Sequence, residues 1–92
     1  MSAIVSVIGK DKKGIIARVS SALYKRDVNI MDISQTILEK YFTMIMIVDL
    51  VEMTVPFTDL ADELDQLGQE IGVSIKIQHQ DIFDAMHHID KE

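Results

Sequence analysis

The stretch VIGKDKKGII, from Val7 to Ile16, decides how this chain is organised. It passes from apolar residues through Gly9, four intervening residues and Gly14 into a second apolar segment. This pattern predicts a strand, a short loop and a helix, which is also the outline of a phosphate-binding loop. Such a loop needs a lysine and a hydroxyl directly after its second glycine, whereas Ile15 and Ile16 stand there. The sequence therefore excludes nucleotide hydrolysis.

The rest of the chain continues the alternation of strand and helix patterns. Apolar residues at helical spacing predict one buried stripe in each of two helices, and period-two alternation predicts two further strands. The stripes are Ile16, Val19, Ala22 and Leu23 in the first helix, and Leu60, Leu64, Leu67 and Ile71 in the second. The predicted elements are a strand over Ala3–Ile8, a loop over Gly9–Gly14, a helix over about Gly14–Arg26, a hairpin of Val28–Leu38 with Tyr41–Val51, a helix between Pro56 and Gly72, a strand over residues 73–78, and a short helix from Asp81.

The order β-α-β-β-α-β predicts an α+β fold of the ferredoxin-like βαββαβ type. This fold is a four-stranded antiparallel sheet with two helices on one face, followed here by a C-terminal helix. The 92 residues are expected to form one domain, 1–92, with a core over 2–79 and a helical extension over 81–91. In this arrangement the first and third strands are central, and both are apolar on both faces.

Two helices cover only one face of such a sheet, so the apolar second face needs a cover. The candidates are the terminal helix, a second copy of the chain, or another domain. We expect a homodimer.

Composition limits the possible partners. The chain is 48% hydrophobic, has a formal net charge of −6 and lacks cysteine, which argues against a disulfide framework, a thiolate zinc site and general nucleic-acid binding. No apolar run is long enough to span a membrane, and a cytoplasmic protein is expected. The charge is uneven, because residues 1–48 carry +3 and residues 49–92 carry −9. The basic residues that gather around the first loop and helix are Lys10, Lys12, Lys13, Arg18, Lys25 and Arg26.

The loop between the first strand and the first helix has two interpretations. It is either a plain connection with its lysines in solvent, or an anion site formed by the helix start and those lysines. Asp11 is suited to cap the helix or to accept hydrogen bonds from a ligand amine. A loop that offers both N–H donors for an anion and a carboxylate for an amine suits a zwitterion such as an amino acid.

Gly9-x-Asp11-x-x-Gly14-Ile15, together with DVNIMDISQ at Asp27–Gln35, resembles the ACT domain, a small regulatory ligand-binding module. The likeness covers about residues 2–79. The chain is similar to stand-alone single-ACT proteins of unknown function, and to the ACT portions of the glycine cleavage system transcriptional repressor and of formyltetrahydrofolate deformylase. One departure is Lys13, where many members have proline.

The resemblance implies pairing of domains and an amino-acid site at their interface. Carried over by position, the site residues are Gly9, Lys10, Asp11, Lys12, Lys13, Gly14, Ile15, Asn29 and Ile30. The implied function is sensing of an amino acid or similar small carboxylate, with the signal passed to a partner enzyme or regulator. The alternative is a ligand-free interaction or dimerisation module, and a small enzyme is a third, weaker one.

The remaining polar residues predict no catalytic centre and no cofactor. Asp84 and His88 stand at i, i+4, but two ligands without a thiolate are a weak metal signal. Met44 and Met46 lie in the most apolar run of the chain, where core packing is far more frequent than copper binding. The acidic residues of the second helix, Asp59, Asp62, Glu63, Asp65 and Glu70, are interpreted as its solvated face.

Overall fold

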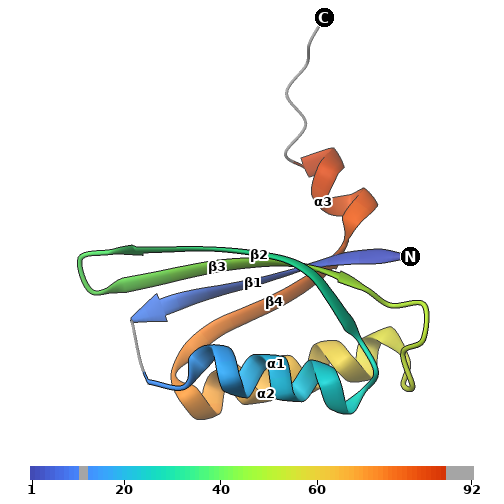
Figure 1. Ribbon diagram of the computed structural model, residues 1–92, viewed down its shortest axis with the longest axis horizontal. Helices are drawn as coiled ribbons and strands as arrows, with labels where there is room; N and C mark the ends of the chain where they lie inside the picture. Colours follow the sequence, from blue (N-terminus) through green and yellow to red (C-terminus); the bar gives the residue numbers. More distant parts are fainter. Residues whose placement is uncertain (11–12, 87–92) are drawn as a thin grey trace, which may run out of the picture.

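The computed structural model describes residues 1–10 and 13–86 of the chain. The elements follow the predicted order and end in a short helix (Figure 1). They are β1 (Ser2–Lys10), α1 (Ile15–Lys25), β2 (Asn29–Leu38), β3 (Tyr41–Asp49), α2 (Phe57–Ile71), β4 (Val73–His79) and α3 (Gln80–Met86). The described helices are too short and too polar for any of them to cross a membrane.

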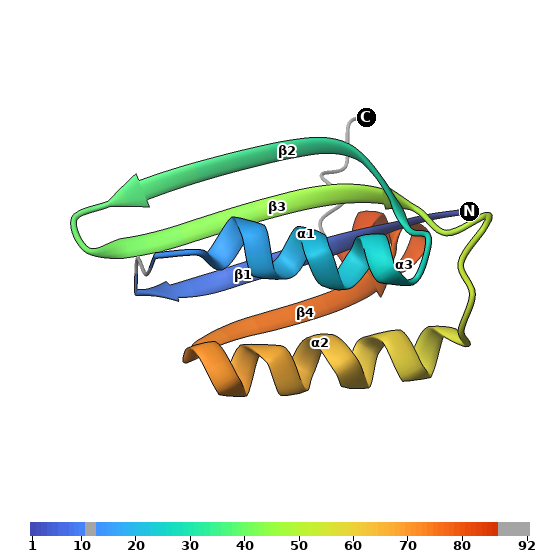
Figure 2. The same ribbon diagram turned by 60° about the horizontal axis from the view of Figure 1, so that its bottom comes forward.

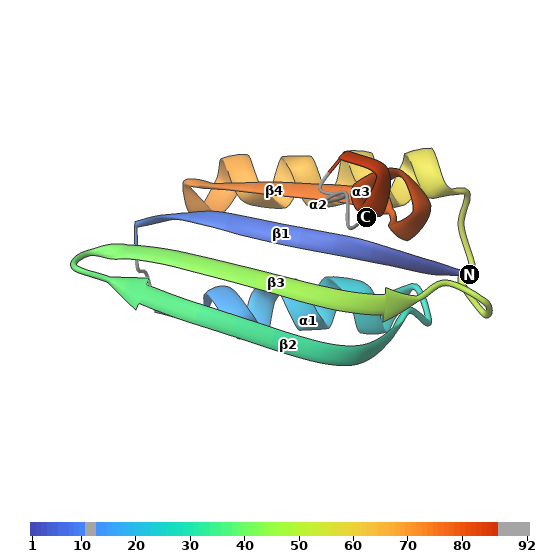
Figure 3. The same ribbon diagram turned by 90° about the horizontal axis from the view of Figure 1, so that it is seen from above.

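The four strands form one antiparallel sheet in the order β2-β3-β1-β4. This order confirms the prediction that the first and third strands are central and that the second and fourth are edges. Helices α1 and α2 run in opposite directions on one face of the sheet (Figure 2). Helix α3 lies on the other face, near the start of β1 (Figures 1 and 3).

The core lies between the sheet and the two long helices. Val5 and Val7 of β1 and Met44 and Met46 of β3 are fully buried there, which confirms a packing role for the two methionines. Helix α2 contributes Leu60 and Leu64, as predicted. Its C-terminal residue is followed by Gly72 at φ 88°, a left-handed conformation that glycine adopts easily.

The predicted apolar stripe of α1 was right at Val19, Ala22 and Leu23 and wrong at Ile16. Ile15, Val19 and Leu23 are the buried residues, whereas Ile16 is 37% exposed. Ile15, Val19 and Leu23 stand at i, i+4 and i+8 and form the buried stripe, and Ile16 lies about 100° around the helix from Ile15, at the edge of that stripe. Ile16 lies on the flank of α1 that faces β2.

Strand β1 extends two residues beyond its predicted end. Gly9 pairs with Phe42 on one side and Val73 on the other, and Lys10 pairs with Tyr41. The predicted loop over Gly9–Gly14 was therefore wrong at its start, because two neighbouring strands provide partners that a local pattern does not reveal. A Cβ atom on Gly9 would stand 2.8 Å from Cγ1 of Val73, so the glycine permits close approach of β4.

Strand β2 contains a bulge that changes which residues share a face. Ile30 pairs with Val48 and Asp32 with Ile47, which leaves Met31 as the extra residue. Beyond the bulge, Ile33 and Ile37 pair with Met46 and Phe42 and so face the helix side of the sheet. The prediction that Met31, Ile33 and Ile37 share one face was thus right for the two isoleucines, whereas Met31 lies in the bulge and has no partner position on β3.

Candidate functional site

The predicted ligand loop leads directly into α1. Gly14 is the N-cap residue at φ 84°, and its carbonyl accepts the first helical hydrogen bond from the Arg18 N–H at 2.9 Å. Lys13 and Gly14 are exposed, but Ile15 is only 2% exposed and belongs to the core. Ile15 can therefore offer a ligand its backbone N–H and not its side chain. The proposed cap Asp11 and its neighbour Lys12 lie outside the described residues.

Two of the basic residues around α1 are held by acids of α2. Arg18 donates a 2.7 Å hydrogen bond to Glu70, and Arg26 binds Glu63 through Nε and Nη2 at 2.9 and 2.7 Å. The hydrogen bonds from Arg26 lower the pKa of the Glu63 carboxyl, and the same contacts raise the pKa of Arg26. The side chains of Glu63 and Glu70 remain 37% and 67% exposed, in line with the predicted solvated face, and each also pairs with a cation because α1 lies beside α2.

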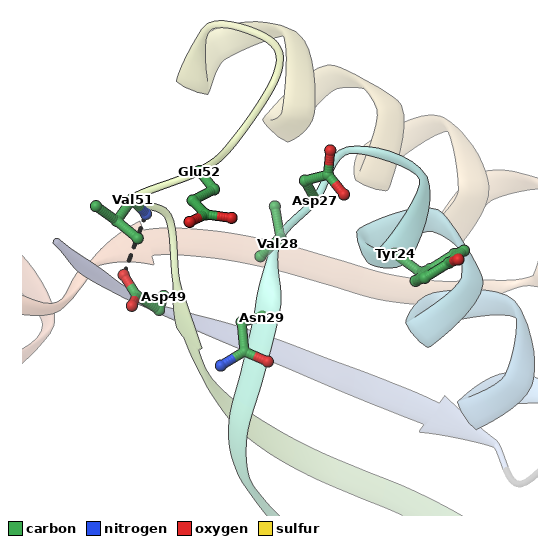
Figure 4. Close-up of a pocket in the computed structure, with 7 residues that line it drawn as sticks. All are labelled: Tyr24, Asp27, Val28, Asn29, Asp49, Val51 and Glu52. Carbon is green, nitrogen blue, oxygen red and sulfur yellow. Dashed lines mark hydrogen bonds between the residues drawn. The ribbon is translucent and has the colours of Figure 1, made fainter.

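The second group of predicted residues begins β2, at the far end of α1. Asn29 lines a cavity of about 390 Å³ between the C-terminal turn of α1, the start of β2 and the segment after β3 (Figure 4). Its lining side chains include three carboxylates and neither lysine nor arginine. The lining residues are Tyr24, Asp27, Val28, Asn29, Asp49, Val51 and Glu52.

The acidic cavity has a partly fixed geometry. Oδ1 of Asp49 accepts a 3.1 Å hydrogen bond from the Val51 N–H and lies 3.6 Å from the N-terminal ammonium of Met1. Asp27 stands at φ 58° in the turn that ends α1, where its N–H bonds to the Tyr24 carbonyl. The lining residues include no cation, and Asp49 already faces the Met1 ammonium, so Asp27 and Glu52 are the carboxylates that favour the positive end of a ligand.

A shallow groove joins the two regions along the flank of α1. Two cavities, of about 610 and 240 Å³, share Ala17 and lie between α1 and β2. The larger includes Asn29 and Ile30, and the smaller includes Gly14 and Ile15. Five large hydrophobic side chains of α1 and β2 remain open to solvent: Ile16 (37% exposed), Tyr24 (78%), Met31 (49%), Ile33 (42%) and Ile37 (54%).

One chain does not bring the two groups of predicted residues together. Helix α1 separates them, and its 11 residues span about 16 Å at 1.5 Å per residue. On β3, the partners of Gly9 and Asn29 are Phe42 and Asp49, seven residues or roughly 24 Å apart. The sequence prediction placed both groups at an interface between domains, and it did not include Tyr24, Asp27, Asp49 and Glu52, which line the cavity beside Asn29. Asp27 stands in the quoted DVNIMDISQ stretch, whereas Asp49 and Glu52 carry no local signal.

Other polar residues have structural partners. The Ser20 hydroxyl donates to the Ile16 carbonyl at 2.6 Å within α1. The His79 ring stacks on Phe57 with centroids 4.1 Å apart. Within residues 1–10 and 13–86, no group of three or more His, Cys, Asp or Glu side chains is arranged to hold a metal ion. His87, His88 and Ile89 lie outside that range.

Comparison with known proteins places the chain in one family. The family model for the ACT domain matches residues 2–78. A UPF0237 protein of Clostridium acetobutylicum is 55% identical over 89 residues, which cover 97% of this chain and 100% of that protein. The solved ACT domain protein from Streptococcus pneumoniae is 42% identical, with a TM-score of 0.78 and coverage of 99% of this chain and 98% of that one.

More distant structures share the fold alone. A protein assigned as a glycine cleavage system transcriptional repressor has a TM-score of 0.70 at 23% identity, over 84% of this chain and 44% of that one. A formyltetrahydrofolate deformylase of Burkholderia mallei has a TM-score of 0.76 at 10% identity, over 85% of this chain and 28% of that one. These matches confirm the two resemblances predicted from the sequence.

Proposed function

This chain belongs to the ACT domain family, and from that membership we propose that it senses an amino acid or a similar small carboxylate between two copies of itself. ACT domains are in general small-ligand regulatory modules. The observation that carries the proposal is the separation of the two groups of site residues, which lie at opposite ends of one groove. A second copy can supply the end that each copy lacks.

Antiparallel pairing of two β2 edges would join the groups. In such a pair, the start of β2 in one copy lies beside the end of β2 in the other. The end of β2 lies at the same end of the molecule as Lys10 and Gly14, because Tyr41, just after the β2–β3 turn, pairs with Lys10, and Ile37 lines a cavity with Gly14. Asn29 of one copy would then face the ligand loop of its partner, and each dimer would contain two such composite sites.

The exposed apolar residues support this mode of pairing. Strand β2 is an edge of the sheet, so its outer backbone groups are available to a further strand. Ile33 and Ile37 lie on the helix side of that edge, and Ile16 and Tyr24 lie beside it on α1. Joining two β2 edges would cover these side chains with their counterparts and remove apolar surface from water.

The two halves of the composite site differ in charge, as a zwitterion requires. One half offers the start of α1 with Lys13, which suits a carboxylate, whereas Lys10 lies on the opposite face of the sheet. The other half is the acidic cavity at Asn29, which suits an ammonium group. A bound amino acid would thus link one copy to the other, with its side chain in the groove between α1 and β2.

The regulatory mechanism follows from linkage. A ligand that binds two chains at once favours the paired state by its differential affinity for that state. The consequence would be a change in the surface presented to a partner enzyme or regulator. The proposed role is therefore non-enzymatic.

Thermal unfolding in the presence of each of the twenty amino acids tests the proposal. A ligand at 100 times its Kd should add about 2.7 kcal/mol to the free energy of unfolding. The stabilisation should be lost in Asn29→Ala and in Asp11→Ala, while each variant alone remains folded. If no amino acid stabilises the protein, the sensor function is wrong, and the ligand-free dimerisation module takes its place.

Mixing the two variants tests the composite site itself. A mixed dimer of Asp11→Ala with Asn29→Ala has one site with both substitutions and one site with neither. Binding should therefore return in the mixture, measured by isothermal titration calorimetry, to at most one site per mixed dimer. If each site lay within one chain, every chain in the mixture would still carry one substitution, and mixing would not restore binding. That result would contradict the composite arrangement.

A further inference from the structure

The face of the sheet opposite α1 and α2 is covered at one end only. Ile4 and Ile8 of β1 both lie on this face, since they alternate with the fully buried Ala3, Val5 and Val7. Helix α3 contacts β1 and stands on this face near the start of β1 (Figures 1 and 3). Ile4 is accordingly 4% exposed, whereas Ile8 is 53% exposed.

The uncovered end of this face is basic around its apolar centre. Ile8 lies between Ser74 of β4 and Thr43 of β3 in the sheet register. Lys10 and Lys76, both exposed, lie on the same face of β1 and β4. The residues of these two strands that share the face, among those the structure describes, include no acid: they are Ser2, Ile4, Ser6, Ile8, Lys10, Ser74, Lys76 and Gln78.

Helix α3 has the opposite character on its outer surface. Asp81 and Asp84 are exposed, and Ile82 is 52% exposed. At about 100° per residue, Asp81 lies about 160° around the helix from the half-buried Phe83, whereas Ile82 and Asp84 each lie about 100° from it on opposite flanks. The seven residues of α3 include no lysine or arginine. Helix α3 therefore presents Asp81 on its outer side with Ile82 and Asp84 on the two flanks, and the uncovered sheet end presents one isoleucine with two lysines.

We propose that this open face docks a second copy of the chain, with α3 of each copy on Ile8, Lys10 and Lys76 of the other. Within one chain α3 does not reach this place, because Ile4 and Ile8 are four residues or roughly 13 Å apart. In this dimer the two-fold axis lies between the two facing sheets and runs at right angles to their strands. It reverses the strand direction and so sets α3 of each copy over the uncovered sheet end of the other copy. An axis parallel to the strands would put both α3 helices at the same end and leave Ile8 uncovered.

The contact is isologous, so each dimer forms it twice. It uses α3 and the open sheet face, whereas the proposed ligand interface uses β2 and α1. The two contacts are therefore independent, and either can exist without the other.

Disulfide trapping tests the contact directly, because the chain contains no cysteine. Chains with Ile8→Cys and chains with Ile82→Cys, mixed and oxidised, should form a dimer linked through the two introduced thiols. A matched control replaces the Ile8→Cys chain with a Gln66→Cys chain, which carries an exposed thiol on α2. We expect the Ile82→Cys chain to link to the Ile8→Cys chain at least tenfold faster than to the control chain. Equal rates, or no linkage between the first two chains, would overturn the proposal.

Charge reversal then tests the recognition. Asp81→Lys with Asp84→Lys in the Ile82→Cys chain should slow its linkage to the Ile8→Cys chain at least fivefold. Lys10→Glu with Lys76→Glu in the Ile8→Cys chain should slow the same linkage by a similar factor. Mixing the two reversed chains should restore linkage to within about threefold of the original rate.

Circular dichroism of each charge-reversed chain establishes that the fold is kept. Linkage that is unchanged by reversal, or not restored by combining the two reversed chains, would contradict charge complementarity as its cause.

Discussion

Arg26 binds both carboxylate oxygens of Glu63, with Nε at 2.9 Å from Oε1 and Nη2 at 2.7 Å from Oε2. The pair joins the end of α1 to the middle of α2, across two segments that are 37 residues apart in the sequence. Arg26 is also tied to the segment after β3, because its carbonyl accepts a 3.0 Å hydrogen bond from the Thr54 N–H. One residue thus connects three parts of the fold next to the acidic cavity.

This pair predicts a pH-dependent contribution to stability. The pKa of Glu63 is lower in the folded chain than its ordinary value of 4.5, chiefly because Arg26 donates hydrogen bonds to the carboxylate. The contribution is therefore fully present above pH 4.5 and is lost as the pH falls through the lower, folded pKa. The difference in Tm between the wild type and Glu63→Gln should be constant from about pH 6 to 8 and should shrink below the ordinary pKa of the carboxyl.

The matched control is a double-mutant cycle with Arg26→Gln. In that background Glu63→Gln should have little effect on Tm at any pH, because the partner of the carboxylate has gone. If Glu63→Gln changed Tm as much in the Arg26→Gln background as in the wild type, the pH dependence would come from another group.

Gly68 permits α2 to lie against β4. A Cβ atom at this position would stand 2.6 Å from the Val73 carbonyl oxygen, a backbone atom that cannot move aside alone. Gly68→Ala should therefore lower the free energy of unfolding by about 1–3 kcal/mol, in spite of the better helix propensity of alanine. Urea unfolding measures this change. Gln66→Ala, at an exposed position of the same helix, should stay within about 0.5 kcal/mol of the wild type.

Gly14 is required for its backbone conformation rather than for space. Its φ is 84°, and a Cβ atom there would meet nothing within 4 Å. Gly14→Ala should cost about 1–2 kcal/mol of stability through the left-handed conformation alone. Gly14→Asn should cost less, since asparagine enters this region more readily. Equal losses from the two substitutions in chemical unfolding would argue that the position is restricted by contacts instead.

The proposed β2 pairing makes two neighbouring residues behave differently. Ile37 faces the helix side of β2, where its side chain is 54% exposed, and Thr36 faces the opposite side of the sheet. Ile37→Asp would place a charge in the apolar contact between two copies, and we expect it to raise the dimer dissociation constant at least tenfold. Sedimentation equilibrium measures the constant. Thr36→Asp is the control, and equal effects of the two changes would speak against this interface.

The sequence predicted the fold from local patterns. Apolar alternation and helical stripes depend on neighbouring residues only, so the strand and helix order could be read directly. The double-sided apolar character of β1 and β3 placed them at the centre of the sheet, and Gly72 marked the end of α2. The family resemblance was likewise carried by short stretches, above all Gly9 to Ile15.

What the sequence did not supply were relationships between distant segments. The extension of β1 through Lys10 depends on partners in β3 and β4, and the pairing of Glu63 depends on where α1 lies beside α2. The bulge at Met31 sets which side of β2 faces the helices.

The location of the candidate site also depended on the tertiary structure. By itself the sequence determined the element order, the family and the residues to consider as ligand contacts. Only the tertiary structure separated Gly14 and Ile15 from Asn29 by the length of α1, because a helix holds its two ends apart along a rigid axis. That separation is why the site expected at an interface is proposed to take one group of residues from each of two chains.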